Sequence, residues 1–222
     1  MLRLTASLVA IAWFATVCPA DEKKVPLQTE FPREVLAGTP PNVLARLYPD
    51  LEPPLEKAPE LLVPEGTKNV AVGKKVTSSE SDPIIGKLEF VTDGNKEGTE
   101  ETYVELSPGL QWVQIDLEKP VRIYAVYVWH FFREARGYED VIVQVADDEQ
   151  FTKNVQTIFN NDTDASAKLG IGKDRPYIET YLGKLIDAKG VTGRYVRLYS
   201  RRNTANSLNH YVEVEVFAKP AN

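Results

Sequence analysis

The chain has 222 residues, 43% of them hydrophobic, and a formal net charge of −6 at pH 7. This length and this hydrophobic fraction allow a well-filled core. The acidic balance argues against a nucleic-acid-binding protein, because the neutralisation of phosphates needs a basic surface. It is compatible with neutral sugars and with cations as ligands.

The first twenty residues have the pattern of a secretory signal. Arg3 precedes an apolar run at residues 8–17 that is too short to span a bilayer, and small residues lead to a cleavage point after Ala20. Val17 disfavours a lipoprotein signal at Cys18, and the short run disfavours a retained membrane anchor. We therefore expect residues 1–20 to be a signal peptide. The mature protein is then secreted, periplasmic or at the cell surface, without a transmembrane segment.

Cys18 is the only cysteine of the chain, so the mature protein has none. Its stability must then come from the core, with or without the help of a metal ion. Cysteine-based catalysis and zinc ligation by cysteine are excluded.

Residues 21–67 form a proline-rich segment with nine of the fifteen prolines. Proline fixes φ and removes a backbone donor, so long helices and central strands are not expected there. Residues 42–48 are expected to form one or two helical turns capped by Asn42. Apolar residues such as Phe31 and Leu61 recur, which favours an extended arm that packs partly on the domain. The alternative is a disordered linker.

From Lys68 onward, apolar stretches with a period of two alternate with turn signals such as Asp93-Gly94. The last stretches are the clearest, since Val196 and Leu198 share one face of a strand. The expected strands are residues 70–78, 111–117, 121–129, 141–145, 155–159, 177–182, 193–200 and 211–217. Many short strands at this spacing predict a β-sandwich or a jelly roll.

Short motifs follow one another in a recognisable order along residues 68–219. They are Asn-Val-Ala-Val-Gly-Lys at 69–74, Thr-Asp-Gly-Asn at 92–95, Trp-Val-Gln-Ile-Asp-Leu at 112–117, Val-Gln-Val-Ala-Asp-Asp at 143–148, Gly-Arg-Tyr-Val-Arg-Leu at 193–198 and Val-Glu-Val-Glu-Val-Phe at 212–217. In this order they resemble a discoidin domain (coagulation factor V/VIII type C) of the galactose-binding-like superfamily. The disulfide that ties the domain ends in animal members is absent, which points to the bacterial, carbohydrate-binding-module-like branch.

The resemblance implies an all-β fold, a jelly-roll β-sandwich of two antiparallel sheets, with ligand loops at the pole opposite the termini. It implies a non-catalytic module that recognises a glycan or polysaccharide. The alternative is a protein-interaction or structural envelope module without a sugar ligand, whose proline-rich arm docks a protein partner. An enzyme is not expected, because the adjacent carboxylates at 100–101 and 139–140 point to opposite faces of a strand and no nucleophile motif is present.

The resemblance also implies a structural calcium site. Hard cations take six or more oxygen ligands from carboxylates and carbonyls. Asp93 and Glu213 stand at the places where galactose-binding-like modules often provide such ligands. Asn95, Phe90 and Thr102 are expected to add carbonyl or hydroxyl oxygens. The alternative is that Asp93 only caps a turn. The acidic loop at 160–164, with Asp174 further on, is a second candidate for a cation. Its spacing is not that of an EF-hand and the twelfth-position glutamate is missing, so a solvated loop is expected instead.

Two connections are expected to meet at the ligand pole, because antiparallel strands bring residues 129–138 and 201–209 to one end of a jelly roll. Sugars are bound by aromatic faces together with polar groups that hydrogen-bond hydroxyls. The histidines can instead be structural, and the arginines can instead pair with Glu134 or Glu139 at the surface. The candidate ligand-binding residues are His130, Phe131, Phe132, Arg133, Arg136, Tyr138, Asn203, Asn206 and His210.

Overall fold

The computed structural model of the protein describes residues 22–221. The predicted signal peptide and its cleavage point lie outside the described residues. Within the described part of the chain, no helix combines the length and the apolar character needed to cross a membrane.

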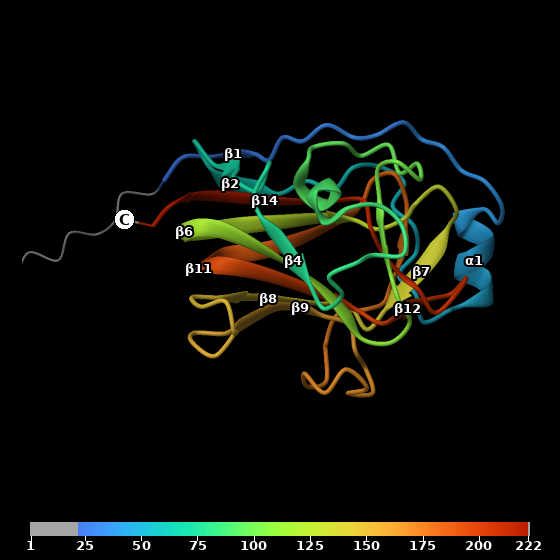
Figure 1. The fold of residues 1–222 in the computed structure, drawn as a ribbon. Helices are drawn as coiled ribbons and strands as arrows, with labels where there is room; N and C mark the ends of the chain where they lie inside the picture. The colour runs from blue at the N-terminus through green and yellow to red at the C-terminus, as the bar shows by residue number, and fades with distance from the viewer. Residues whose placement is uncertain (1–21, 222) are drawn as a thin grey trace, which may run out of the picture.

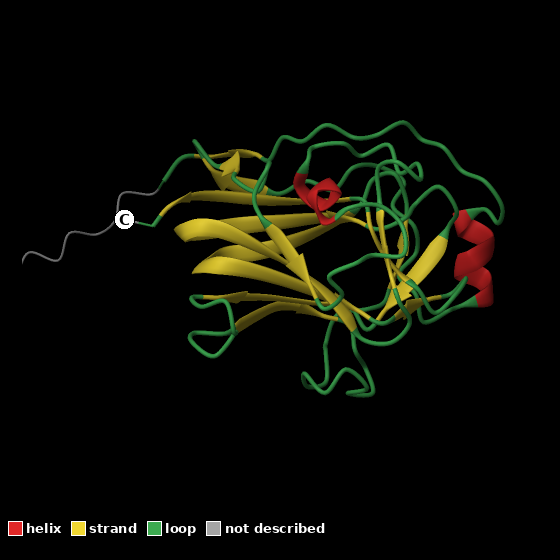
Figure 2. Cartoon of the chain, in the orientation of Figure 1, coloured by secondary structure: helices red, strands yellow, loops and turns green. Residues whose placement is uncertain are grey.

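Short β-strands dominate the described residues, as Figure 2 shows. One helix, α1 (Pro41–Leu47), and one 3-10 helix, η1 (Leu88–Thr92), interrupt them. The strands are β1 (Lys24–Pro26), β2 (Leu62–Pro64), β3 (Lys68–Asn69), β4 (Val76–Ser78), β5 (Val104–Leu106), β6 (Gln111–Trp129), β7 (Arg136–Glu139), β8 (Ile142–Ala146), β9 (Gln156–Asn160), β10 (Tyr177–Glu179), β11 (Lys184–Ser200), β12 (Arg202–Asn203), β13 (Asn209–Tyr211) and β14 (Glu213–Pro220).

The two long strands, β6 and β11, pair with each other along nearly their whole length and turn a corner together. The corner lies at the exposed residues 118–120 of β6 and at Lys189 of β11. Glu118 and Lys189 have left-handed backbone conformations there, with φ of 68° and 54°. Ile115 before the corner and Ile123 after it belong to the same buried cluster. The two halves of β6 therefore face each other across the core, and the sheet folds into two layers.

The remaining strands extend the two layers. The half of β6 before the corner pairs with β4, and the matching half of β11 pairs with β8, which pairs with β9. The half of β6 after the corner pairs with β14, which pairs with β3. All of these pairings are antiparallel, which confirms the predicted all-β sandwich of jelly-roll type.

Three predicted details are wrong. The stretch predicted as one strand at 70–78 contains only the short β4, because the chain turns at Gly73, where φ is 68°. Asn42 does not cap α1. Pro40 precedes the helix as its N-cap, and Pro41 takes the first helical position, for which the fixed φ of proline is preorganised. Residues 111–117 and 121–129, predicted as two strands, are the two halves of β6.

The proline-rich arm runs along the sandwich (Figure 1). It starts in β1 near the C-terminal end of the chain, reaches α1 at the opposite pole and returns to β2, which pairs with β1. Backbone hydrogen bonds hold it there, from Ala37 N to Arg133 O at 2.7 Å and from Glu52 N to Pro176 O at 2.7 Å. Leu51 is 4% exposed, so the arm contributes to the buried interior of the protein.

Candidate functional site

The structure brings the two predicted connections together at the pole opposite the termini. β12 pairs with β7, so that Asn203 lies opposite Tyr138. Nδ1 of His130 lies 2.7 Å from the carbonyl oxygen of His210. The ring of His130 stacks on Tyr138 with centroids 4.3 Å apart. The guanidinium of Arg136 lies 3.2 Å from Nε2 of His210.

Most of these side chains are buried, however. His130 and Tyr138 are 0% exposed, and His210 is 1% exposed. Phe132, Arg136 and Asn203 are also buried. Six of the nine candidate residues are therefore buried. The three that reach the surface are Phe131 and Arg133, which are half-buried, and Asn206, which is exposed.

The arm contributes to this burial. α1 packs against β7 and β10 at the pole. A Cβ added to Gly137 in β7 would lie 2.5 Å from Cδ1 of Leu51, so the arm fits closely over the backbone of β7. The guanidinium of Arg175 donates hydrogen bonds to the carbonyl oxygens of residues 49–51 and fixes the arm beyond α1. Sequence analysis could not locate this contact, because no pattern in the arm says which surface it covers.

The polar groups at the pole mostly satisfy one another. The amide of Asn203 donates to Oδ1 of Asn206 at 2.9 Å and to the carbonyl of Leu208 at 3.0 Å, so it holds the loop in shape. Burial lowers the pKa of His130 to about 4. Burial, with the nearby positive charge of Arg136, lowers the pKa of His210 to about 3. Both imidazoles are therefore neutral near pH 7.

The two carboxylates of the predicted calcium site lie at the same turn. Glu213, at the start of β14, is 0% exposed, and its Oε2 accepts a hydrogen bond from the backbone N–H of Gly94 at 3.1 Å. Its Oε1 has no partner. Asp93 is exposed and accepts a hydrogen bond from Asn95 N at 2.8 Å. Burial raises the pKa of Glu213 to about 9, and the charges of Glu215 and Asp93 add to the effect.

An oxygen-seeking cation fits this arrangement, because the buried Oε1 of Glu213 lacks a donor and Asp93 adds a second carboxylate. Of the other predicted ligands, Asn95 belongs to the same turn. The hydroxyl of Thr102 is engaged with Thr99 instead. Among residues 22–221, no hydrogen bond joins Thr102 or Phe90 to either carboxylate.

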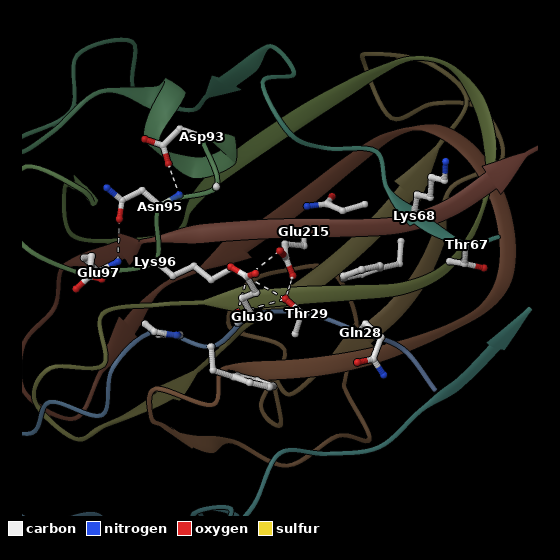
Figure 3. A pocket seen from close by; sticks show the side chains of 15 residues that line it. Gln28, Thr29, Glu30, Thr67, Lys68, Asp93, Asn95, Lys96, Glu97 and Glu215 are labelled. Carbon is white, nitrogen blue, oxygen red and sulfur yellow. Dashed lines mark hydrogen bonds and ion pairs between the residues drawn. The ribbon is translucent and has the colours of Figure 1, made fainter. Parts of the chain in front are cut away.

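A groove of about 710 Å³ lies beside this turn, between the arm and β14 (Figure 3). A buried ion pair forms its inner wall, with Nζ of Lys96 2.8 Å from Oε1 of Glu215. The arm joins this pair, because Lys96 also donates to Thr29 Oγ1 and to the carbonyl of Glu30. The lining carries amides, hydroxyls and aromatic rings, among them Gln28, Thr29, Phe31, Thr67, Asn95 and Phe217. The sequence did not predict the groove, since six of its fifteen lining residues belong to the arm.

The second acidic loop is less solvated than predicted. The carboxylates of Asp140, Asp162 and Asp164 lie within 4.8 Å of one another. Asp162 is 0% exposed. Its carboxylate accepts hydrogen bonds from the backbone N–H groups of residues 164, 166 and 167. It therefore holds the loop together.

No protein-family model and no curated protein matches the chain. Solved structures share its fold. A family 89 glycoside hydrolase from Clostridium perfringens is 17% identical with a TM-score of 0.51, over 69% of this chain and 15% of that chain. A selenomethionine-labelled mutant of the chitosan-binding module 1 derived from a chitosanase/glucanase from Paenibacillus sp. IK-5 is 19% identical with a TM-score of 0.50, over 68% of this chain and 98% of that chain. The lectin domain of lectinolysin, complexed with Lewis B antigen, is 18% identical with a TM-score of 0.50, over 68% and 97%. These similarities show that the chain shares the β-sandwich fold of these structures.

The burial of the two histidines predicts how they titrate. Because their pKa values are lowered in the folded state, both imidazoles should stay neutral from pH 8 down to pH 5 in nuclear magnetic resonance spectra. Below about pH 6.5 the imidazoles of the unfolded chain bind protons, whereas those of the folded protein stay neutral. The free energy of unfolding is therefore unaffected by the histidines above about pH 6.5 and decreases as the pH falls toward 4. The loss is at most about 1.4 kcal/mol per pH unit for each histidine. A midpoint near 6.5 for either imidazole in the folded protein would contradict the burial.

Proposed function

We propose that this protein is a non-catalytic carbohydrate-binding module that is exported and acts outside the cytoplasm. The proposal rests chiefly on the fold, which matches nearly the full length of a chitosan-binding module and of a lectin domain that binds Lewis B antigen. The predicted signal peptide supports export.

The groove beside the arm offers the chemistry that a sugar needs. A sugar ring presents hydroxyls to planar amides and a C–H face to aromatic rings. Gln28 and Asn95 provide amides, and Phe31 provides an aromatic ring that is 36% exposed. The partly exposed Phe131 and Arg133 at the pole are the alternative contact surface.

We further propose that calcium stabilises the module through Asp93 and Glu213, with Asn95 in the same turn. A bound cation would take the place of the proton that burial keeps on Glu213, and it would fix the turn that carries Gly94. The unpartnered Oε1 of Glu213 supports this assignment. This ion would be structural, since neither carboxylate lies among the buried pole residues.

One observation favours the alternative function, a protein-interaction module. α1 covers the pole where ligand loops were expected, and it exposes apolar side chains. Leu47 is 66% exposed, and Val43 and Tyr48 are 38% and 40% exposed. A protein partner that binds this apolar surface would explain why the arm is kept at the pole.

Substitutions in the groove should weaken glycan binding. A ligand is first identified on a glycan array, and its affinity is then measured by calorimetry. Gln28→Ala and Phe31→Ala should each weaken binding about five- to hundredfold, because losing one contact group costs about 1–3 kcal/mol. Arg133→Ala is the matched control at the pole and should bind like the unchanged protein.

The reverse pattern, loss of binding with Arg133→Ala only, would move the site to the pole. If no glycan binds, the protein-interaction alternative is favoured instead. Circular dichroism must show that each variant is folded.

Removal of calcium should lower the melting temperature. An ion that binds only the folded state stabilises it by about 2.7 kcal/mol at a hundredfold excess over Kd. Chelation should therefore destabilise the protein, and Asp93→Ala should abolish the response to both chelator and added calcium. Asp82→Ala, an exposed aspartate outside the turn, is the control and should keep the response. A response that survives in Asp93→Ala would place any bound ion elsewhere.

A further inference from the structure

The walls of the groove between the arm and β14 carry more negative than positive charge. Its charged lining residues are Glu30, Lys68, Asp93, Lys96, Glu97 and Glu215. Four of these side chains are acidic and two are basic. This charge balance bears on which glycans the groove accepts, because ligand groups of opposite charge are attracted and those of like charge are repelled.

Lys96 and Glu215 neutralise each other and leave nothing for a ligand. The ammonium of Lys96 donates to Glu215 Oε1 at 2.8 Å, to Thr29 Oγ1 at 2.9 Å and to the carbonyl oxygen of Glu30 at 2.8 Å. Oε2 of Glu215 accepts from the hydroxyl of Thr29 at 2.6 Å. An ammonium has three donors, so the protein itself engages all of them and both oxygens of the carboxylate.

The carboxylates of Glu30 and Glu97 are available to a ligand. Both residues are exposed and belong to the groove lining. The hydrogen bonds that these two residues make within the described part of the chain involve backbone atoms only. Asp93 is a third exposed carboxylate of the lining, but it is already assigned to the proposed calcium site.

The charges are separated along the groove, as Figure 3 shows. Asp93 and Glu97 lie toward one end, Lys68 lies at the other, and Glu30 lies between them. The one lining cation outside the buried pair is therefore remote from Glu97. A positive group of a ligand at the acidic end would meet carboxylates without a competing lysine or arginine of the lining.

The rest of the lining fits sugar rings that carry such a positive group. The amides of Gln28 and Asn95 suit hydroxyls, and the ring of Phe31 suits a C–H face. The volume of about 710 Å³ lies within the roughly 300–1,000 Å³ of ligand sites. An amino group on a sugar adds three charged donors, and hydrogen bonds between ionised partners are stronger than those between neutral ones.

We propose that the groove selects glycans with free amino groups, whose ammonium groups pair with Glu97 and Glu30 while the sugar rings contact Phe31 and Gln28. This inference rests on the proposed function, because it takes the groove to be the glycan site. It adds the substrate class. The same charges disfavour glycans that carry carboxylates or sulfates.

The test compares three tetrasaccharides that differ only in the group on the second carbon of each ring. Chitotetraose carries ammonium groups, N-acetylchitotetraose carries acetamides and cellotetraose carries hydroxyls. Calorimetry on the mature protein, with calcium present and at low salt, should give chitotetraose an affinity about fivefold or more above the other two, since an exposed ion pair adds up to about fivefold. High salt should reduce this preference, because exposed charges are screened.

Substitutions of the two carboxylates assign the preference to the groove. Glu97→Gln and Glu30→Gln should each weaken chitotetraose binding about two- to fivefold and leave cellotetraose binding unchanged. Lys68→Gln, at the other end of the groove, should not weaken chitotetraose binding. Glu60→Gln is the matched control at an exposed position of the arm outside the groove lining, and it should change neither affinity.

Two outcomes would overturn the inference. One is an affinity for chitotetraose no greater than that for the two neutral tetrasaccharides. The other is a preference for chitotetraose that survives unchanged in the double variant Glu30→Gln/Glu97→Gln. If Gln28→Ala and Phe31→Ala still weaken the binding of some other glycan, the proposed function stands and only the substrate class is wrong. Absence of binding to every glycan would contradict the proposed function itself.

Discussion

The buried ion pair between Lys96 and Glu215 joins the arm to the sandwich. Lys96 is 9% exposed and Glu215 is 8% exposed, and both also bind Thr29 of the arm. The ammonium lies 4.3 Å from the ring centroid of Trp129. Breaking such a pair by removing one partner typically costs about 3–5 kcal/mol, because the other charge stays buried. The arm is therefore held by a polar contact that a flexible linker would lack.

The docked arm changes what the sandwich presents to solvent. On one side it forms the outer wall of the groove beside Asp93, and Phe31 covers the stacked rings of Tyr127 and Trp129. At the pole it covers β7 and encloses a second, smaller cavity, whose lining includes Phe132 and Tyr181 of the domain. Both cavities are therefore composite, since each takes part of its lining from the arm and part from the domain. Ligand recognition by this chain has to be understood from the two parts together.

The layers of the sandwich were predictable because a period of two in sequence is enough to place Ile115 or Leu198 in the core. The meeting of His130 with His210 was also predictable, since strand direction decides which connections share a pole. The exposure of these residues was not, because it depends on where Leu51 and its neighbours dock, and contacts between distant segments leave no periodic signal.

The most direct test of the docked arm is native-state hydrogen exchange. The account predicts that the amides of Ala37 and Glu52, which donate to Arg133 and Pro176 of the domain, exchange orders of magnitude more slowly than unstructured amides. Exchange of these two amides at the rate of an unstructured peptide, while the amides of β6 stay protected, would contradict it. The arm would then be a tether, and neither composite cavity would exist in solution.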